Sequence, residues 1–255
     1  MSDRFQRTKM LIGEEAFGKL SRSRVALFGI GGVGGYTLEA LARSGVGAID
    51  IIDSDVVDIS NINRQLIALE STVGKSKVEI AAARLRDIDP DCEVRAFQTF
   101  FTPENSKDFD FSKYDYVIDA IDTVTGKLEI IKKANEAGVP VISCMGTGNK
   151  LDPGKLQVAD IYKTSVCPLA RTMRYECRKR GIKKLKVIFS TEEPIRPKEK
   201  AADALSADEG DNTDESAVSG AVSPSPRRSV PGSSAFVPGA AGLMIAAEVV
   251  KDLIS

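Results

Sequence analysis

Histidine is absent from the 255-residue sequence, and this absence excludes several kinds of catalytic site. A chain without histidine has no imidazole general base, no histidine metal ligand and no Ser/His or Cys/His nucleophile pair. Any chemistry therefore depends on carboxylates, lysine, arginine, cysteine, backbone amides and bound metal. The net charge of −1 also argues against a protein that coats a polyanion, although local basic clusters still count.

Paired cysteines of the zinc-binding kind are lacking as well. The four cysteines, Cys92, Cys144, Cys167 and Cys177, show no CxxC spacing. A zinc site built from thiolates normally has two such pairs, so we expect no zinc. The N-terminal residues lack the apolar stretch of a secretion signal. We therefore expect reduced thiols and a cytoplasmic location.

The sequence contains no uninterrupted apolar run of about 18 residues, the length that a membrane-spanning helix needs. The nearest candidate, from Ala235 to Val250, contains Pro238, two glycines and Glu248. We expect a buried C-terminal helix here and leave docking on a membrane surface open.

Strand patterns and helix patterns alternate along the first 150 residues. The expected strands are Arg24–Phe28, Ala48–Ile52, Glu93–Phe100, Tyr116–Ala120 and Val139–Cys144. The expected helices are Arg4–Leu11, Tyr36–Arg43, Lys75–Ile88 and Thr125–Ala137. This alternation predicts an α/β fold, a Rossmann-like and mostly parallel sheet with helices on both faces.

The pattern changes after Gly154. Leu156–Ile161 and Lys186–Phe189 are expected to be strands that extend the sheet with antiparallel pairing, on either side of a basic and partly helical segment. Residues 199–226 are rich in Ala, Ser, Asp, Glu and Gly, without an aromatic residue, and are expected to be disordered. Ser234–Ile254 is expected to return as a helix.

A glycine-rich turn follows the first expected strand and opens the next helix. Gly29, Gly31 and Gly34 have the GxGxxG spacing, and Gly32 adds a further glycine. Glycine permits a tight turn and close backbone approach, and a helix N-terminus attracts phosphate. Asp53, at the end of the second strand, is placed to accept hydrogen bonds from a ribose.

The turn alone does not choose between NAD and ATP. A nicotinamide-dependent dehydrogenase is the first alternative, since the same turn binds dinucleotides. Many such enzymes use a histidine or a Tyr/Lys pair for proton transfer. The sequence has no histidine and no YxxxK spacing, which counts against a dehydrogenase.

Polar residues after the second and fourth strands favour ATP. A triphosphate needs cations for its β and γ phosphates and a carboxylate for Mg²⁺. Arg64 and Lys77 supply the cations, and Asp122, just past the fourth strand, supplies the carboxylate. Asp55, near Asp53, is a further candidate for nucleotide contact.

The order of these motifs resembles a known family. GxGGxG, an aspartate-ended strand, Ser60-Asn61-Ile62-Asn63-Arg64-Gln65, Gly74-Lys75-Ser76-Lys77 and Asp119-Ala120-Ile121-Asp122 are similar to the ThiF-type adenylating family. This family includes the ubiquitin-activating, molybdopterin-synthase-activating and thiamine-thiocarboxylate adenylating enzymes. The resemblance covers residues 4 to about 195 and the last twenty or so.

The resemblance implies roles for individual residues. It implies that Asp53 holds the ribose, that Asp122 binds Mg²⁺, and that the phosphates are surrounded by Asn61, Arg64, Gln65 and Lys77. Arg7 resembles the arginine that reaches the γ-phosphate of the neighbouring subunit, which implies a homodimer with composite sites. The implied catalytic residues are therefore Arg7, Arg64, Lys77 and Asp122, with ATP and Mg²⁺ as cofactors and a bound monovalent cation left open.

The family's domain organisation then applies to the whole chain. We expect a single ThiF-type domain over 1–255. Its nucleotide-binding part spans 1–150, and a crossover with extra strands spans 151–195. A disordered insert at 199–230, which departs from the family pattern, precedes a C-terminal helix at 232–255.

Several stretches resemble the tRNA-modifying branch of this family, in which zinc-binding CxxC pairs are missing. They include Arg4–Thr8, Cys167–Ala170, Phe189–Glu192 and Gly232–Phe236. The resemblance implies adenylation of the carboxylate of threonylcarbamoyladenosine in tRNA, ring closure and release of AMP, with net loss of water. It leaves open an association with a cysteine desulfurase and sulfur-acceptor system.

A basic segment after Pro168 is consistent with an RNA substrate. Cations contact phosphates and an aromatic residue stacks on a base, whereas the plainer interpretation is a solvated helix face. The candidates for tRNA contact are Arg171, Arg174, Arg178 and Lys179, with Tyr175 among them, followed by Arg180, Lys183, Lys184 and Lys186.

Three alternatives stay open. Cys167 lies where thioester-forming relatives place their acceptor cysteine, so a covalent role is one of them; Cys92 and Cys144 are expected in the core and Cys177 on a helix among cations. The second is an activator of a ubiquitin-like sulfur-carrier protein. The third is a catalytically inactive nucleotide-binding adaptor, which intact Arg64, Lys77 and Asp122 disfavour.

Overall fold

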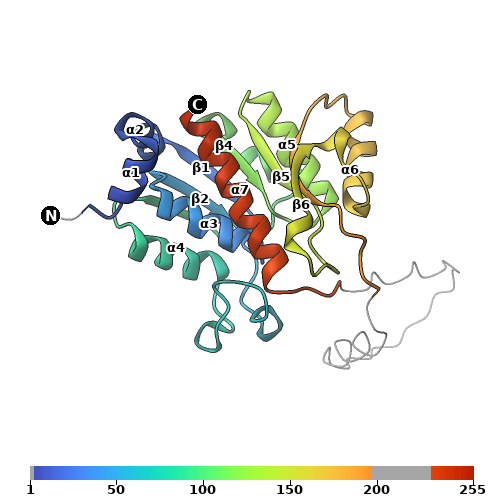
Figure 1. The fold of residues 1–255 in the computed structure, drawn as a ribbon, viewed down its shortest axis with the longest axis horizontal. Coiled ribbons are helices and arrows are strands. Elements are labelled where there is room, and N and C mark those ends of the chain that lie inside the picture. The colour runs from blue at the N-terminus through green and yellow to red at the C-terminus, as the bar shows by residue number, and fades with distance from the viewer. Residues whose placement is uncertain (1–2, 197–230) are drawn as a thin grey trace, which may run out of the picture.

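The computed structural model describes residues 3–196 and 231–255, which form one seven-stranded sheet with helices on both faces (Figure 1). The strands follow one another across the sheet in the order β3-β2-β1-β4-β5-β7-β6. Their bounds are β1 Arg24–Phe28, β2 Ala48–Ile52, β3 Glu93–Phe97, β4 Tyr116–Asp119, β5 Val141–Cys144, β6 Leu156–Asp160 and β7 Lys186–Ser190. All neighbouring pairs are parallel except β6 and β7, which confirms the predicted fold class.

Alternate residues of the central strands point to opposite faces, because the side-chain period of a strand is two. Val25 and Leu27 of β1 pack with α3 (Gly34–Ser44), α4 (Lys77–Ile88) and α7 (Phe236–Ile254). Ala26 and Phe28 pack on the other face, against the segment from residue 101 to 114 and α5 (Val124–Glu136). The helix α6 (Pro168–Lys179) lies beside α5 on that face.

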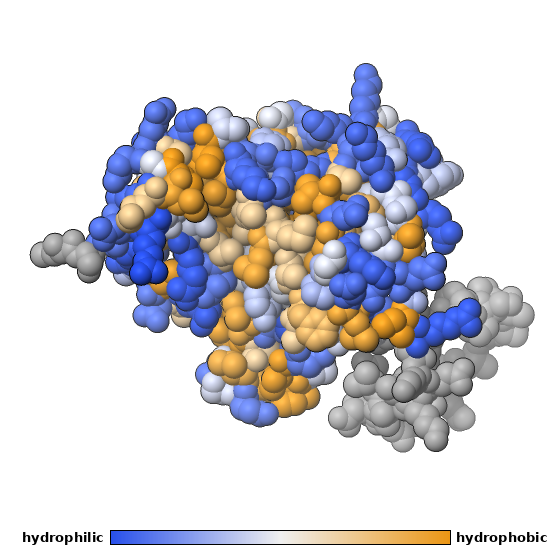
Figure 2. Space-filling view, viewed as in Figure 1, coloured by the Kyte–Doolittle hydropathy of each residue, from blue (hydrophilic) through white to orange (hydrophobic). Residues whose placement is uncertain are grey.

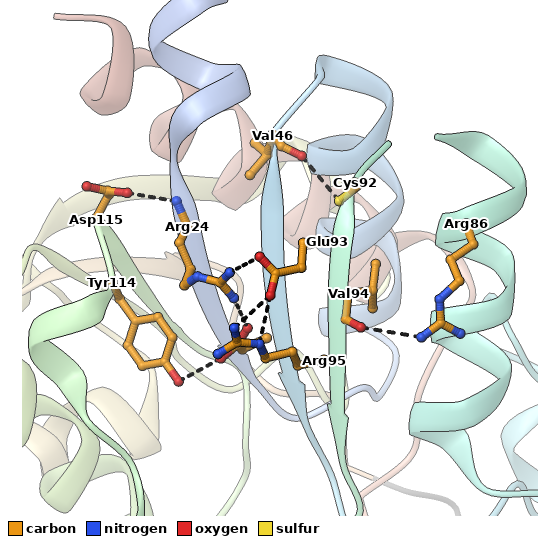
Figure 3. A network of polar contacts seen from close by, with 10 residues as sticks. Arg24, Val46, Arg86, Cys92, Glu93, Val94, Arg95, Tyr114 and Asp115 are labelled. Carbon is orange, nitrogen blue, oxygen red and sulfur yellow. Dashed lines mark hydrogen bonds and ion pairs between the residues drawn. The ribbon is translucent and has the colours of Figure 1, made fainter. Parts of the chain in front are cut away.

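The amino edge of the sheet is held by a polar network (Figure 3). Asp50, 3% exposed within β2, accepts hydrogen bonds from Arg24 at 2.6 Å and from the hydroxyl of Tyr114 at 3.0 Å. Arg24 also pairs with Glu93, and its backbone N–H donates to Asp115 at 2.7 Å. These contacts fix the starts of β1, β3 and β4 relative to β2, so the polar groups at this edge are already paired with one another.

The C-terminal helix α7 confirms the expectation of a buried helix. Val237, Ala241, Ile245 and Val249 are all buried on one side of it, and Gly242 packs so closely that a Cβ there would lie 2.3 Å from the carbonyl oxygen of Val33 on the turn before α3. The described helices include none that is long and apolar enough to cross a membrane.

Some element boundaries differ from the sequence predictions. The helix expected at Arg4–Leu11 is α1 (Gln6–Ile12), and a second helix that was not predicted, α2 (Glu14–Arg22), follows after Gly13, which has a φ of 85°. The strand β3 ends at Phe97, because the N–H of Thr99 turns back to the carbonyl of Phe97. The expected disordered insert at 199–230 lies outside the described residues.

The contact between α7 and β4 yields a stability prediction. The Tyr116 hydroxyl donates to Asp252 at 2.7 Å, and Lys186 also contacts Asp252 at 2.6 Å. Tyr116→Phe should lower the free energy of unfolding by about 1–2 kcal/mol, because a hydrogen bond to a charged group is lost from a buried ring. Urea denaturation measures it. Tyr175→Phe, at a 65% exposed tyrosine, is the control, and equal stability of both variants would contradict the assignment.

Candidate functional site

The glycine-rich turn follows β1, at the point where the order of the strands along the sheet reverses, between β1 and the adjacent β4. At Gly29, with φ of 92°, a Cβ would sit 2.8 Å from the carbonyl oxygen of Ala120; at Gly34 it would sit 1.8 Å from the carbonyl oxygen of Gly29. These two glycines are therefore required by packing. At Gly31 a Cβ would meet nothing within 4 Å. The turn is tight on its inner side and open at Gly31, as a phosphate-binding turn requires.

Free backbone donors face this opening. Within the described residues, none of the backbone N–H groups of residues 31–34 donates a hydrogen bond, and the helix α3 begins at Gly34 without a side-chain cap. Unpaired N–H groups at the start of an eleven-residue helix carry partial positive charge and attract phosphate. The turn therefore has unpaired N–H donors of the kind that a phosphate would use, and its role in phosphate binding stays a prediction.

Asp53 lies directly beside the turn. Its carboxylate accepts a hydrogen bond from the N–H of Ile30 at 2.6 Å and from that of Asp55 at 2.8 Å. Burial raises the pKa of Asp53, and these two N–H donors oppose the rise. The second lone pair of each oxygen stays available, so Asp53 is oriented by the turn to accept ribose hydroxyls.

Two cations lie on the elements that adjoin the turn. The Lys77 ammonium, 5% exposed at the start of α4, pairs with Asp55 at 2.7 Å. The stem of Arg64 packs against Gly32, 3.4 Å from the position of an added Cβ. Its guanidinium donates to the carbonyl of Ser60 and to Asn63, both at 2.9 Å. Arg64 and Lys77 are therefore positioned by local contacts at the turn that phosphate would occupy.

Buried polar groups near these cations separate structural from ligand-facing residues. Asn61 is 8% exposed and its side-chain oxygen accepts the N–H of Asp58 at 3.3 Å, which is a local capping contact. Gln65 is 7% exposed, and its side-chain oxygen has no hydrogen-bond partner in the described residues. Such an unpaired buried group costs about 1–3 kcal/mol. Gln65 thus fits a ligand contact better than Asn61 does.

A fully buried ion pair at the end of β4 was not predicted from the sequence. The Lys127 ammonium, on α5, donates to both carboxylate oxygens of Asp119 at 3.1 and 3.2 Å and to the carbonyl of Cys144 at 2.7 Å. The Ser143 hydroxyl also donates to Asp119. Burial raises the pKa of Asp119, while the ammonium and the hydroxyl oppose the rise. The network joins β4, α5 and β5 at the carboxyl edge.

Asp122 follows this network on the loop before α5. The N–H of Ile121 donates to Asp119 at 3.3 Å, so the buried pair also orients the residues that lead to Asp122. Asp122 is exposed, and it lies two residues after Ala120, the residue that contacts Gly29. Mg²⁺ commonly binds to one or two carboxylates together with phosphate oxygens. The single carboxylate of Asp122 fits that pattern, in which phosphate oxygens supply other ligands. The described residues contain no cluster of three or more metal-binding side chains.

Arg7 lies far from the site of its own chain. It is exposed on α1, and Arg4, just before α1, donates to the carbonyl of Ile88 at the far end of α4 at 2.8 Å. Lys77 begins α4 at the opposite end, so the length of that helix, about 17 Å, separates the two regions. Arg7 therefore does not complete the site within one chain.

The basic segment forms α6, and its side chains have unequal environments. Arg171, Arg178 and Lys179 are exposed, whereas Arg174 donates to the carbonyl of Thr164 at 2.9 Å and to its hydroxyl. Two open hollows, of about 430 and 350 Å³, border this helix rather than the glycine turn. The first is lined by Tyr162, Arg178, Gly181, Ile182 and Lys183.

The cysteines are buried thiols in the described structure. Burial raises the pKa of Cys144 to about 12 and the pKa of both Cys92 and Cys177 to about 11. Cys177 lies on α6 as expected, but it faces the core rather than its cationic neighbours. Cys167, at the start of α6, is 1% exposed, so its sulfur is not presented to a substrate.

Comparisons with known proteins agree with this geometry. A model of the ThiF family matches residues 5–255. The chain is 45% identical over 255 residues to the tRNA threonylcarbamoyladenosine dehydratase of Bacillus subtilis, with all of this chain and 96% of that protein covered. The dehydratase of the same name from Escherichia coli is 40% identical over 202 residues, 76% of this chain and 75% of that protein. The crystal structure of E. coli TcdA in complex with ATP matches with a TM-score of 0.82 and 32% identity, covering 98% of this chain and 93% of that chain.

The buried pair yields the second prediction. Lys127→Met should lower the free energy of unfolding by about 3–5 kcal/mol, because it leaves the Asp119 carboxylate buried without a cation. Replacing both partners, in Asp119→Leu with Lys127→Met, should recover much of the loss. Urea denaturation compares the two variants with the wild type. Unchanged stability of the single variant would refute the ion pair as a structural element.

Proposed function

The chain belongs to the ThiF family, and from this premise we infer that it is an ATP-dependent adenylating enzyme that dehydrates threonylcarbamoyladenosine in tRNA. The binding of ATP is supported mainly by the glycine turn, whose unpaired N–H groups lie near the side chains of Asp53 and Arg64. The substrate follows from the full-length similarity to the B. subtilis dehydratase.

The first chemical step joins the substrate carboxylate to AMP. A carboxylate is a poor electrophile, because its oxygen is a poor leaving group. Its oxygen therefore attacks the α-phosphorus of ATP, pyrophosphate leaves, and an acyl-adenylate forms. This displacement needs neutralisation of phosphate charge more than it needs a protein base. We assign that neutralisation to Arg64 and Lys77, with Gln65 as a further phosphate contact, and to Arg7 from the partner subunit.

The second step closes the ring. A nitrogen already present in the substrate attacks the activated acyl carbon and loses its proton, and AMP leaves with the former carboxylate oxygen. The substrate thereby loses one water overall. No nucleophile from the enzyme is required, so a site without histidine is sufficient. We leave Cys167 out of the mechanism, because its sulfur is buried.

The magnesium ion is part of the proposal. Asp122 would hold it at the carboxyl edge of the sheet, together with phosphate oxygens of the nucleotide. The ion would supply positive charge to the phosphates when bound. A monovalent cation and an association with a cysteine desulfurase and sulfur-acceptor system stay predictions, as does a cytoplasmic location.

We also propose a homodimer with composite sites. Arg7 lies far from its own site, and large apolar side chains are exposed on the face that carries α7 (Figure 2). Among the described residues, Phe236 and Leu243 of α7 are each 51% exposed, and Met10 and Leu11 of α1 are 80% and 85% exposed. Val56, Ile59, Leu69 and Val73 are exposed on the loops between β2 and α4. Apolar surface of this extent supports a protein interface, and a two-fold axis would bring each Arg7 to the partner's site.

The function is tested with the full-length protein, ATP, Mg²⁺ and tRNA that carries threonylcarbamoyladenosine. AMP release together with loss of one water from the modified nucleoside, measured by mass spectrometry, is the expected result. If the nucleoside stays unchanged and a ubiquitin-like protein instead triggers pyrophosphate exchange, the sulfur-carrier activator replaces this proposal. If neither substrate triggers exchange, the chain is a nucleotide-binding adaptor.

The site assignment predicts the effect of two substitutions. Arg64→Ala and Asp122→Ala should each reduce AMP release by about 100-fold or more, because each removes charge stabilisation from the phosphates. Thermal unfolding should stay near that of the wild type, since neither side chain is in the core. Arg86→Ala and Asp87→Ala, exposed on the distant end of α4, are the matched controls. Full activity of both site variants would remove them from the mechanism.

The composite site predicts complementation between inactive variants. Arg7→Ala and Asp122→Ala should each be inactive alone. After the two are mixed and allowed to exchange subunits, activity should return to about a quarter of the wild-type value, because half of the dimers are mixed and each has one intact site. A mixture that stays inactive despite demonstrated exchange would place Arg7 outside the partner's site.

A further inference from the structure

One face of α6 carries an exposed row of cations around an exposed aromatic ring. Arg171, Tyr175 and Arg178 are four and three residues apart, so they lie above one another on the helix surface. The opposite face, with Ala170, Met173 and Cys177, packs into the core. Tyr175 is 65% exposed, which is a large exposure for an aromatic side chain that has no packing role.

The cations of this row are available to a ligand. Arg174 is occupied by Thr164, and Arg180 pairs with Glu176. The described residues offer no ion pair to Arg171, Arg178 or Lys179. The available positive charge is therefore concentrated on the same side of α6 as Tyr175.

The row ends at the hollow of about 430 Å³ described above. The ring of Tyr162 forms one wall, with its hydroxyl donating to the carbonyl of Ile182. The Arg178 guanidinium lies over that ring, 5.2 Å from its centre. The hollow is shallow and open, and a flat ring linked to a phosphate would lie against the stacked guanidinium with Lys183 nearby.

The position of the row relative to the reaction edge favours a polymer. The residue that precedes α6 is Cys167, whose sulfur is 3.9 Å from the position of a Cβ on Gly146, just past the carboxyl end of β5. From there the row leads away from that edge, and Arg171 and Arg178 are about 10 Å apart along the helix axis. A chain that reacts at the edge of the sheet would extend along this row.

We propose that Arg171, Tyr175, Arg178 and the Tyr162 hollow form a binding site for an unpaired segment of the RNA substrate. The two arginines contact phosphates along the strand, Tyr175 stacks on one unpaired base, and another base lies against the Arg178 guanidinium at the hollow. Sequence-specific RNA recognition uses unstacked bases in loops, placed on aromatic rings and guanidinium planes. This inference rests on the proposed function, because the substrate is taken to be a tRNA.

The test measures binding of substrate tRNA to the full-length protein by fluorescence anisotropy at several salt concentrations. Tyr175→Ala should weaken binding about tenfold or more, whereas Tyr175→Phe should bind as the wild type does, because stacking needs the ring and not the hydroxyl. Arg171→Ala should reduce the slope of log affinity against log salt by about one. Arg86→Ala, an exposed arginine on α4, is the control and should change neither quantity.

The kinetic readout separates positioning of RNA from general damage. Tyr175→Ala should raise KM for tRNA and leave KM for ATP unchanged. Wild-type affinity of Tyr175→Ala and Arg171→Ala would overturn the site, as would equal weakening by Tyr175→Phe and Tyr175→Ala. If the wild type binds tRNA through this row but never dehydrates it, the proposed function fails and the binding site stands.

Discussion

The close packing of the first glycine turn against the end of β4 determines where this protein can do chemistry. Gly29 touches the carbonyl of Ala120 so tightly that a side chain has no room, and β1 and β4 are hydrogen-bonded neighbours although far apart in sequence. The ion pair between Asp119 and Lys127, whose side chains are both fully buried, fixes the end of β4 next to this contact. The free N–H groups of the turn, Asp53 and the exposed Asp122, to which we assign phosphate, ribose and Mg²⁺, are all placed by this one junction at the switch point of the sheet.

Local periodicity explains why most of the fold was predictable. The central strands are short apolar segments flanked by glycine, proline or aspartate, and their positions were predicted to within a few residues. The glycine turn was equally clear, because its spacing has a steric reason at Gly29 and Gly34. The helix α2 was missed, since it buries only Leu20 and contains Gly18, which weakens the helical pattern.

Long-range pairing explains what could not be predicted. Nothing in the sequence joins Asp119 to Lys127 and Ser143, because that network depends on the packing of α5 over two strands. The cations of α6 look equivalent in sequence, yet Arg174 donates to Thr164 while Arg171 and Arg178 have no carboxylate partner among the described residues. The remoteness of Arg7 from its own site likewise depends on a long-range contact, between Arg4 just before α1 and the carbonyl of Ile88 at the far end of α4.

The central claim is that the carboxylate is activated by transfer of AMP and not by another group. Substrate tRNA with a heavy-oxygen label in the threonylcarbamoyl carboxylate tests this directly, with mass analysis of the released nucleotide after one turnover. The account predicts that one labelled oxygen appears in the phosphate of AMP, because that oxygen attacks the α-phosphorus and leaves with it. Label in inorganic phosphate with release of ADP, or label in water, would contradict adenylation as the activating step.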